Sequence, residues 1–243
     1  HITFRDGSKT IISSDNTWKA TKGPLLKNML YYGEIYDARL EQAGWNTPGF
    51  DDSAWQQAVN RTPPFGRLTA HTAHPDRVIE QIKPVQIKTL ENGNIWVDFG
   101  VEISGWVRLN HVTGPAGHKI DLKFNSNLYS GDNTYICRGQ GPESYAPRFN
   151  WFVFSAVEIS HWPGELKPDD VTAEVVHTHI DESAVFETSN PLFNEINTIW
   201  KRSQTDNMHG GIASDCPHRE RNAYTGDGQV ACVTVMHNYD SRS

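Results

Sequence analysis

Short runs in which apolar and polar residues alternate make up most of the first 180 positions. Turn residues interrupt these runs about every eight to twelve positions, at sites such as Asp6-Gly7, Gly23-Pro24 and Gly114-Pro115. Period-two alternation is typical of strands with one buried face, and closely spaced turn signals between strands favour sandwiches. The pattern therefore predicts an almost wholly β segment up to about residue 180.

The clearest alternation lies in the middle of the chain. Ile95–Phe99, Gly105–Leu109 and Lys119–Phe124 each change between apolar and polar residues with a period of two. We expect three consecutive strands here. A helix of three or more turns between residues 90 and 130 is excluded, because the Gly-Pro turns leave no room for one.

The pattern changes to a helical period after Phe186. Asn190-Pro191 combines an N-cap residue with Pro at the first helical position. Five apolar residues then recur at helical spacing: Leu192, Phe193, Ile196, Ile199 and Trp200. A second helix is expected from about Asp227 to His237. Helices that occur only at the end of a β-rich chain indicate the beginning of a helical domain.

These patterns predict three regions. The first is an N-terminal β-sandwich over residues 1–82. A second β-sandwich covers residues 83–185, and the start of a helical domain covers residues 186–243. Residues 63–67 and 71–75 contain Pro and Gly, which resist both helix and sheet, so they are a predicted linker.

Composition and charge exclude several classes of protein. The 243 residues contain 22 Lys and Arg against 29 Asp and Glu, which disfavours a nucleic-acid partner because phosphate binding needs a basic face. No apolar run reaches the length of a membrane span. Three cysteines without a CxxC spacing indicate neither a zinc site nor a disulfide framework. The chain starts at His1 rather than Met, so we expect a mature or trimmed product, and export is favoured while the compartment stays open.

Charged side chains gather between the two predicted helices. The segment from Asp215 to Asp227 reads Asp-Cys-Pro-His-Arg-Glu-Arg-Asn-Ala-Tyr-Thr-Gly-Asp. It brings three carboxylates, two guanidinium groups, an imidazole and a phenol onto one loop, where binding and catalytic residues are often found. The alternative is a solvated loop that holds a network of arginines and carboxylates.

This segment resembles the bacterial α-L-rhamnosidases of glycoside hydrolase family 78, which have Asp-Cys-Pro, Arg-Glu-Arg and Thr-Gly-Asp in this order. Gly33–Arg39 and Gly49–Trp55 resemble the N-terminal sandwich of that family, and Ser104–Val107 resembles its concanavalin-like sandwich. The chain departs from the family at Val101-Glu102, where Gln-Asn is common, and at Tyr224, where Trp is frequent. The resemblance implies a mostly β fold: two jelly-roll-like β-sandwich domains followed by the first helices of an (α/α)6 barrel. It also implies that residues 1–82 are a possible carbohydrate-binding domain, that residues 83–185 form the concanavalin-like sandwich, and that residues 186–243 are the truncated start of the catalytic domain.

The same resemblance implies a function. The family hydrolyses terminal α-L-rhamnosyl linkages with inversion, and Glu220 corresponds to its general acid. The residues that correspond to, or surround, its sugar-binding groups are Asp215, Asp227, Arg219, Arg221, His218 and Tyr224. The partner is a rhamnose-containing oligo- or polysaccharide, and no cofactor is implied. The family's base is a Glu far downstream, beyond residue 243, so we expect the chain alone to be inactive.

A general acid has to keep its proton, so the pKa of Glu220 should lie above the ordinary Glu value of about 4.3. Asp215 and Asp227 would raise it as neighbouring anions, while Arg219 and Arg221 would lower it. We therefore expect a raised pKa and at least one arginine that faces away from Glu220. The three carboxylates should converge on one concave surface, because all must reach one sugar ring.

Two other functions stay open. Polysaccharide lyase family 27 resembles the same architecture, which implies an L-rhamnose-α-1,4-D-glucuronate lyase. In that case Arg219 or Arg221 neutralises the uronate, and Tyr224 or His218 takes part in proton transfer. The third hypothesis is a non-catalytic, rhamnose-binding fragment.

Two further sites have simpler explanations. A Ca²⁺ ion or a second sugar could bind an oxygen-rich group in the N-terminal region, but Asx turns and an Asp-Arg ion pair are favoured. That group consists of Asp15, Asn16, Glu34, Asp37 and Arg39. Trp45 and Trp55 could stack on a sugar, although a core position is favoured.

Overall fold

The computed structural model describes residues 1–62, 65–66, 69, 73–126 and 132–240. It confirms a mostly β chain whose two α-helices come at the end. The strands are β1 (Ile2–Thr3), β2 (Lys9–Thr10), β3 (Lys19–Ala20), β4 (Leu25–Met29), β5 (Gly33–Asp37), β6 (Gln56–Gln57), β7 (Asp76–Ile82), β8 (Gln86–Thr89), β9 (Ile95–Val112), β10 (Lys119–Phe124), β11 (Asp132–Ile136), β12 (Glu143–Tyr145), β13 (Phe152–Ser160), β14 (Val171–Thr178), β15 (Met208–His209) and β16 (Ile212–Ala213). The α-helices are α1 (Pro191–Asp206) and α2 (Thr225–Asn238), and short 3-10 helices cover Ala38–Leu40 and Pro168–Asp170.

The chain forms two compact units. The smaller one contains residues 1–24 and 40–70, with the ribbons β1-β2 and β3-β6. The larger one contains residues 25–39 and 71–243, so β4 and β5 belong to it although they precede most of the smaller unit. The two units do not coincide with the three regions that the sequence predicts. The predicted domain borders at residues 82 and 185 stay a prediction. Much of the expected linker lies outside the described residues.

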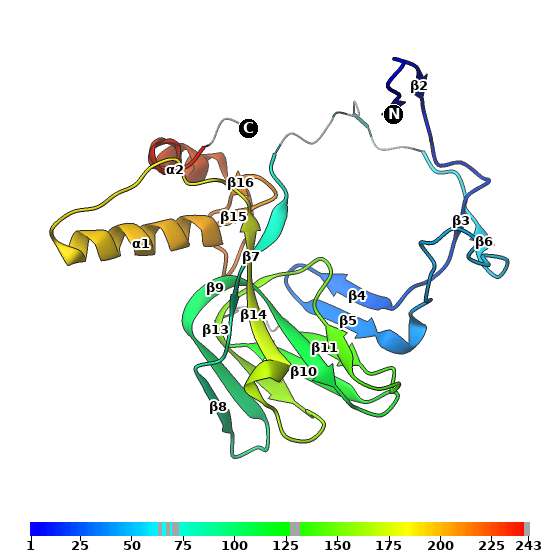
Figure 1. Ribbon diagram of the computed structural model, residues 1–243, viewed down its shortest axis with the longest axis horizontal. Coiled ribbons are helices and arrows are strands. Elements are labelled where there is room, and N and C mark those ends of the chain that lie inside the picture. Colours follow the sequence, from blue (N-terminus) through cyan, green and yellow to red (C-terminus); the bar gives the residue numbers. More distant parts are fainter. Residues whose placement is uncertain (63–64, 67–68, 70–72, 127–131, 241–243) are drawn as a thin grey trace. The chain divides into compact units, whose positions relative to one another are not determined.

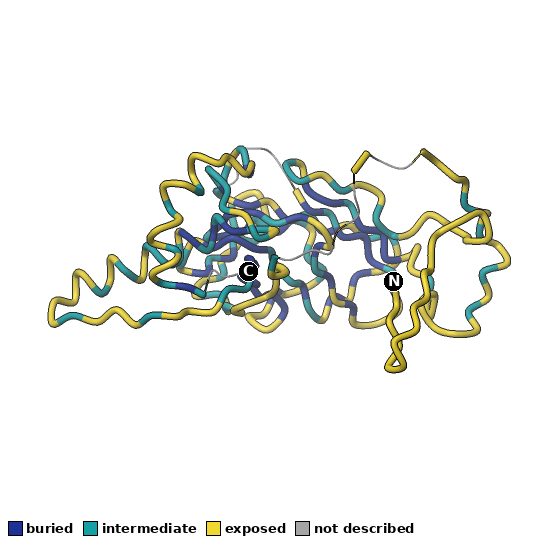
Figure 2. Tube along the Cα trace, turned by 90° about the horizontal axis from the view of Figure 1, so that it is seen from above, coloured by how far each residue is buried: buried dark blue, intermediate teal, exposed yellow. Residues whose placement is uncertain are grey.

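One sheet of ten strands organises the larger unit (Figure 1). Its order is β4-β5-β11-β10-β13-β9-β14-β7, and β8 and β12 pair with β9 in addition. All neighbours are antiparallel except β5 and β11, which are parallel. The buried residues follow these strands, as the dark blue segments in Figure 2 show. The sheet therefore carries the core.

β9 corrects one detail of the sequence analysis. Ile95–Phe99 and Gly105–Leu109 are not separate strands but the two halves of one strand of 18 residues. Gly100 has φ +76° and the register with β13 shifts between Phe154 and Ala156, so the pair bends without ending. The expected third strand, Lys119–Phe124, is confirmed, and the structure has no helix between residues 90 and 126.

Aromatic rings fill the centre of this sheet. The ring centroids of Phe124 and Phe152 lie 4.4 Å apart, and those of Phe124 and Phe154 lie 4.9 Å apart. Phe99 packs edge-on against Phe154 at 5.9 Å. These rings bury large apolar areas, which is the dominant stabilising contribution in such cores.

A buried carboxylate joins three strands. Glu174 of β14 is 1% exposed, and it accepts two hydrogen bonds from the Arg108 guanidinium of β9, at 2.7 and 3.0 Å. Trp106 Nε1 and Gln81 Nε2 donate to the same carboxylate at 2.5 and 2.9 Å. Burial opposes its ionisation, but these hydrogen bonds outweigh the burial and hold the pKa of Glu174 below its usual range.

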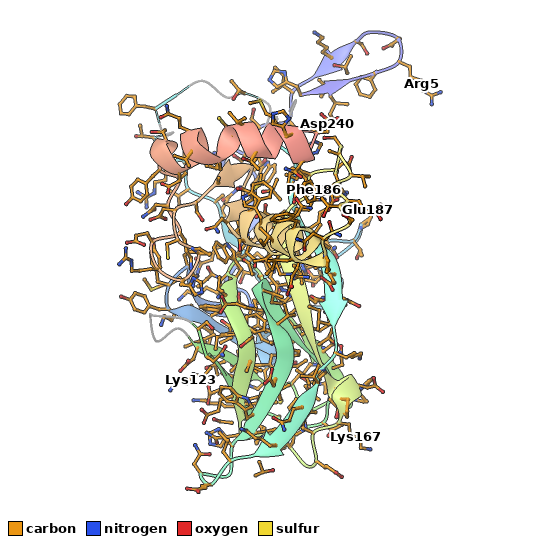
Figure 3. All side chains as sticks on the ribbon, turned by 90° about the vertical axis from the view of Figure 1, so that its left-hand side faces the viewer. Arg5, Lys123, Lys167, Phe186, Glu187 and Asp240 are labelled. Atoms are coloured by element: carbon orange, nitrogen blue, oxygen red, sulfur yellow. The ribbon has the colours of Figure 1, made fainter. Side chains whose placement is uncertain are left out.

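The helical segment begins where the sequence predicts. Asn190 caps α1 by accepting from Leu192 N at 3.0 Å, and Pro191 is its first residue. The apolar stripe of α1 is nevertheless exposed in this structure, at Leu192, Phe193, Ile196 and Ile199. The polar side of α1 lines a groove of about 570 Å³ together with residues of β7 and β14 and with Phe186. Figure 3 shows Phe186 and Glu187 at the helical end of this unit.

The simpler explanations hold for most of the N-terminal polar residues. Asp15 forms an Asx turn with Thr17 N at 2.8 Å, and Asp37 pairs with Arg39 through two hydrogen bonds. Glu34 is buried and accepts from Tyr145 at 3.0 Å. Among the described residues no group of three or more His, Cys, Asp or Glu is arranged to hold a metal ion.

The two tryptophans of the smaller unit differ. Trp55 is half-buried, packs against Phe50 at 5.6 Å and donates to Gln42. Trp45 is 61% exposed, so the core position expected for it is wrong.

In the described part of the chain, no helix has the length and apolar character needed to cross a membrane.

Candidate functional site

The charged loop connects a short hairpin to α2. β15 and β16 pair through Met208 and Ala213, and the chain then turns back on itself before α2 begins at Thr225. Cys216 O accepts main-chain hydrogen bonds from Arg219 N at 3.2 Å and Arg221 N at 3.1 Å. These bonds give the loop a fixed tight turn.

Three charged residues of the loop are joined. Arg219 and Glu220 form an ion pair, and the Asp215 carboxyl lies close enough to Glu220 to influence its pKa. The expected rise in pKa is wrong for this arrangement, because the hydrogen bond from Arg219 lowers the pKa of Glu220 below its ordinary value. Asp215, which was expected to raise the pKa of Glu220, lowers it as well.

Arg221 faces away from Glu220, which confirms the expectation that at least one arginine does so. Its side chain is buried and donates from Nε to Pro217 O at 3.0 Å. A direct contact between Arg221 and a sugar stays a prediction, and this burial argues against it.

His218 connects the loop to the sheet. Its Nε2 lies 3.1 Å from Glu102 Oε1, and Ser126 donates to the other oxygen of Glu102 at 2.9 Å. Glu102 was not a candidate site residue, although it stands where the sequence departs from the family pattern. That departure was the one signal in the sequence that could have identified it.

The last two candidates lie at the start of α2. Tyr224 is the N-cap residue and Asp227 belongs to the first turn, and both are exposed. The convergence of the Asp215, Glu220 and Asp227 carboxylates on one surface stays a prediction.

A second polar chain lies under the hairpin. Ser104 Oγ is 2.7 Å from His209 Nε2, and His209 Nδ1 is 3.5 Å from Asp76 Oδ2. Trp151 stacks on the His209 ring with centroids 3.6 Å apart. Ser, His and Asp are the residue types of hydrolytic triads, but Ser104 is fully buried and no substrate can reach it. The group anchors the hairpin to β7 and β9.

Asp206, at the end of α1, was also absent from the candidate residues. Its carboxylate accepts from Ser104 N at 2.9 Å, and burial raises its pKa to about 6. Arg202 and His218 act in the opposite direction, while Glu102 raises the pKa further. An ionised, buried Asp206 therefore destabilises the fold at neutral pH.

We expect Asp206→Asn to flatten the pH dependence of stability. The pKa of Asp206 is about 6 in the folded chain, against an ordinary 3.8, so the folded state binds more protons and stability falls as the pH rises between these values. The amide cannot ionise but can still accept from Ser104 N. The variant should gain about 2 kcal/mol at pH 7, or roughly 5 °C in Tm. Melting curves from pH 4 to 7 measure the difference, with the exposed Asp181→Asn as control. Parallel curves for the variant and the parent would contradict the prediction.

Three family models match consecutive parts of the chain. The α-L-rhamnosidase N-terminal domain matches residues 1–80, and the bacterial α-L-rhamnosidase concanavalin-like domain matches residues 88–177. The bacterial α-L-rhamnosidase 6 hairpin glycosidase domain matches residues 181–243. The three models therefore leave just two short connections unmatched.

Known proteins agree with these matches. An α-L-rhamnosidase of Formosa agariphila and one of Streptomyces avermitilis are each 33% identical to the chain over 98% and 99% of its length. The chain spans about a quarter of the length of these relatives, 27% and 25% respectively.

Two solved structures share the fold. The α-L-rhamnosidase of Dictyoglumus thermophilum matches with a TM-score of 0.90 and 35% identity, over 98% of this chain and 28% of that one. The Streptomyces avermitilis α-L-rhamnosidase complexed with L-rhamnose matches with a TM-score of 0.87 and 32% identity, over 98% and 24%.

Proposed function

Because this chain belongs to the bacterial α-L-rhamnosidase family and contains its N-terminal domains with the start of its helical domain, we propose that the whole protein hydrolyses terminal α-L-rhamnosyl linkages. The observation that supports this most directly is the cluster of Asp215, Arg219 and Glu220 on the loop before α2. It lies in the part of the chain that matches the glycosidase domain. The partner would be a rhamnose-containing oligo- or polysaccharide.

In this proposal Glu220 is the general acid that protonates the glycosidic oxygen. Asp215, Asp227 and Arg219 hold the sugar, while His218 and Tyr224 border the site. Glu220 must be protonated to act, and its pKa is lowered as long as Arg219 pairs with it. Arg219 therefore has to turn from Glu220 to the substrate before the proton is transferred.

We further propose inversion at the anomeric carbon. An inverting glycosidase needs a second carboxylate about 6.5–9.5 Å from the acid, so that a water molecule fits between the base and the sugar. The family resemblance assigns this base to a Glu beyond residue 243.

The products of the complete enzyme test this function. A rhamnosyl-glucuronate disaccharide should release rhamnose without any new ultraviolet absorbance, because hydrolysis leaves no double bond. Proton NMR at early times should show β-L-rhamnose first, as inversion of an α-linkage requires. An unsaturated uronate would instead identify the lyase. Binding of rhamnose without turnover would identify a binding protein, and α-L-rhamnose as first product would contradict inversion.

A further inference from the structure

The loop that carries Glu220 is held from the side of the sheet by residues far away in sequence. Tyr31, in the turn between β4 and β5, donates its hydroxyl to Glu220 O at 2.5 Å. This contact joins positions 189 residues apart. It fixes the main chain of Glu220 and leaves the carboxyl group untouched.

Arg221, the residue that follows Glu220, holds the main chain on the C-terminal side of Glu220. Its Nη1 donates to Leu30 O and to Trp151 O, both at 2.7 Å. Its guanidinium lies over the rings of Trp151 at 4.7 Å and Phe152 at 5.1 Å. A planar guanidinium can stack on rings and donate in several directions at once, which an ammonium group cannot do.

The backbone at Arg221 adopts an unfavourable conformation. Arg221 has φ +53°, a left-handed conformation that non-glycine residues rarely adopt. The surrounding contacts have to compensate for that conformation. Glu220 Oε2 is buried without a hydrogen-bond partner among the described residues. The position of Glu220 Oε2 therefore depends on the main chain of Glu220, which Tyr31 and Arg221 hold.

We propose that Tyr31 is a positioning residue for Glu220, with Arg221 as the anchor that holds the loop against the sheet. This inference rests on the proposed function. The turn between β4 and β5, which lies outside the helical segment, would then set where the acid meets the glycosidic oxygen. Tyr31 does not touch the reacting atoms, and its effect passes through the Glu220 main chain.

The leaving group of the substrate separates positioning from simple stability. In the complete enzyme, Tyr31→Phe should lower kcat on a natural rhamnoside on the order of 10-fold, because the acid is displaced from its oxygen. KM should stay within about two-fold, because the sugar contacts remain. An activated aryl rhamnoside needs no proton, so its kcat should change by less than about two-fold. Arg221→Lys should show the same selective loss, since it keeps the charge but not the carbonyl contacts.

Tyr135→Phe is the matched control. It removes another tyrosine hydroxyl, which donates to the buried Glu143 at 2.6 Å, and it should affect neither substrate selectively. Glu220→Gln is the reference for loss of the acid. If Glu220→Gln is selective for the natural substrate but Tyr31→Phe lowers both rates equally or neither, positioning by Tyr31 is overturned while the function stands. If Glu220→Gln itself shows no selectivity, the acid role is overturned, and the inference with it.

Discussion

Glu220→Gln is expected to slow the cleavage of a natural rhamnoside by the complete enzyme by about 10² to 10⁴-fold, the range that general acids supply. A sugar leaving group is a poor one and has to be protonated as it departs, whereas Gln has no proton of suitable acidity to donate. The leaving group of an activated aryl rhamnoside departs as a stable anion without a proton, so cleavage of this substrate should be slowed much less. Steady-state kinetics on both substrates measure the ratio.

Glu187→Gln is a suitable control, because it makes the same chemical change at an exposed carboxylate outside the charged loop. It should leave both rates unchanged. Equal losses on the two substrates for Glu220→Gln would instead assign Glu220 to substrate positioning. The chain of 243 residues alone should turn over neither substrate. Turnover by it would identify Asp215 or Asp227 as the base.

The second large effect concerns stability. Glu174→Ala should lower the free energy of unfolding of the chain by about 3 kcal/mol, because it leaves the Arg108 guanidinium and the Trp106 and Gln81 donors without their buried acceptor. The pKa of Glu174 is below its usual range, so the stabilisation is present above the ordinary Glu pKa and disappears as the pH falls. Urea unfolding at pH 7 and at pH 3 measures both statements.

An exposed ion pair provides the control for that experiment. Lys83 and Asp169 are 3.1 Å apart, but their side chains are 56% and 83% exposed. Asp169→Ala should therefore change the unfolding free energy by less than about 1 kcal/mol. If the two variants unfold at the same urea concentration, burial does not decide the contribution of the Glu174 pair.

Local signals explain why the elements could be predicted. The N-cap Asn190 with Pro191 determines where α1 begins, and the alternation in Lys119–Phe124 determines a strand. Both depend on neighbours within a few residues. The bend in β9 could not be predicted in this way. In the sequence, Gly100 indicates the end of a strand. In the structure, β9 pairs with β13 on both sides of this glycine, so the strand continues.

The residues of the candidate site also fall into those that are close in sequence and those that only the fold brings together. Asp215, Arg219 and Glu220 are close in sequence, and the loop keeps them together. Glu102, Asp206 and Tyr31 reach the loop or its surroundings through the fold. Nothing near Asp206 or Tyr31 in the sequence marks them, and Glu102 is marked only by the departure from the family pattern. The lowered pKa of Glu220 was missed for a related reason, because sequence could not decide which arginine would turn toward it.

The position of Tyr31 also bears on the order in which the chain is made. At about 5–20 residues per second, the turn between β4 and β5 leaves the ribosome roughly ten seconds or more before its partner Glu220, 189 residues later. The parallel pairing of β5 with β11 has to wait as well, since their partners Ile35 and Thr134 are far apart in the sequence. Contacts that close such long loops form slowly. The turn that carries Tyr31 therefore waits longest for its partner, and a nascent chain would expose it to proteases during that time.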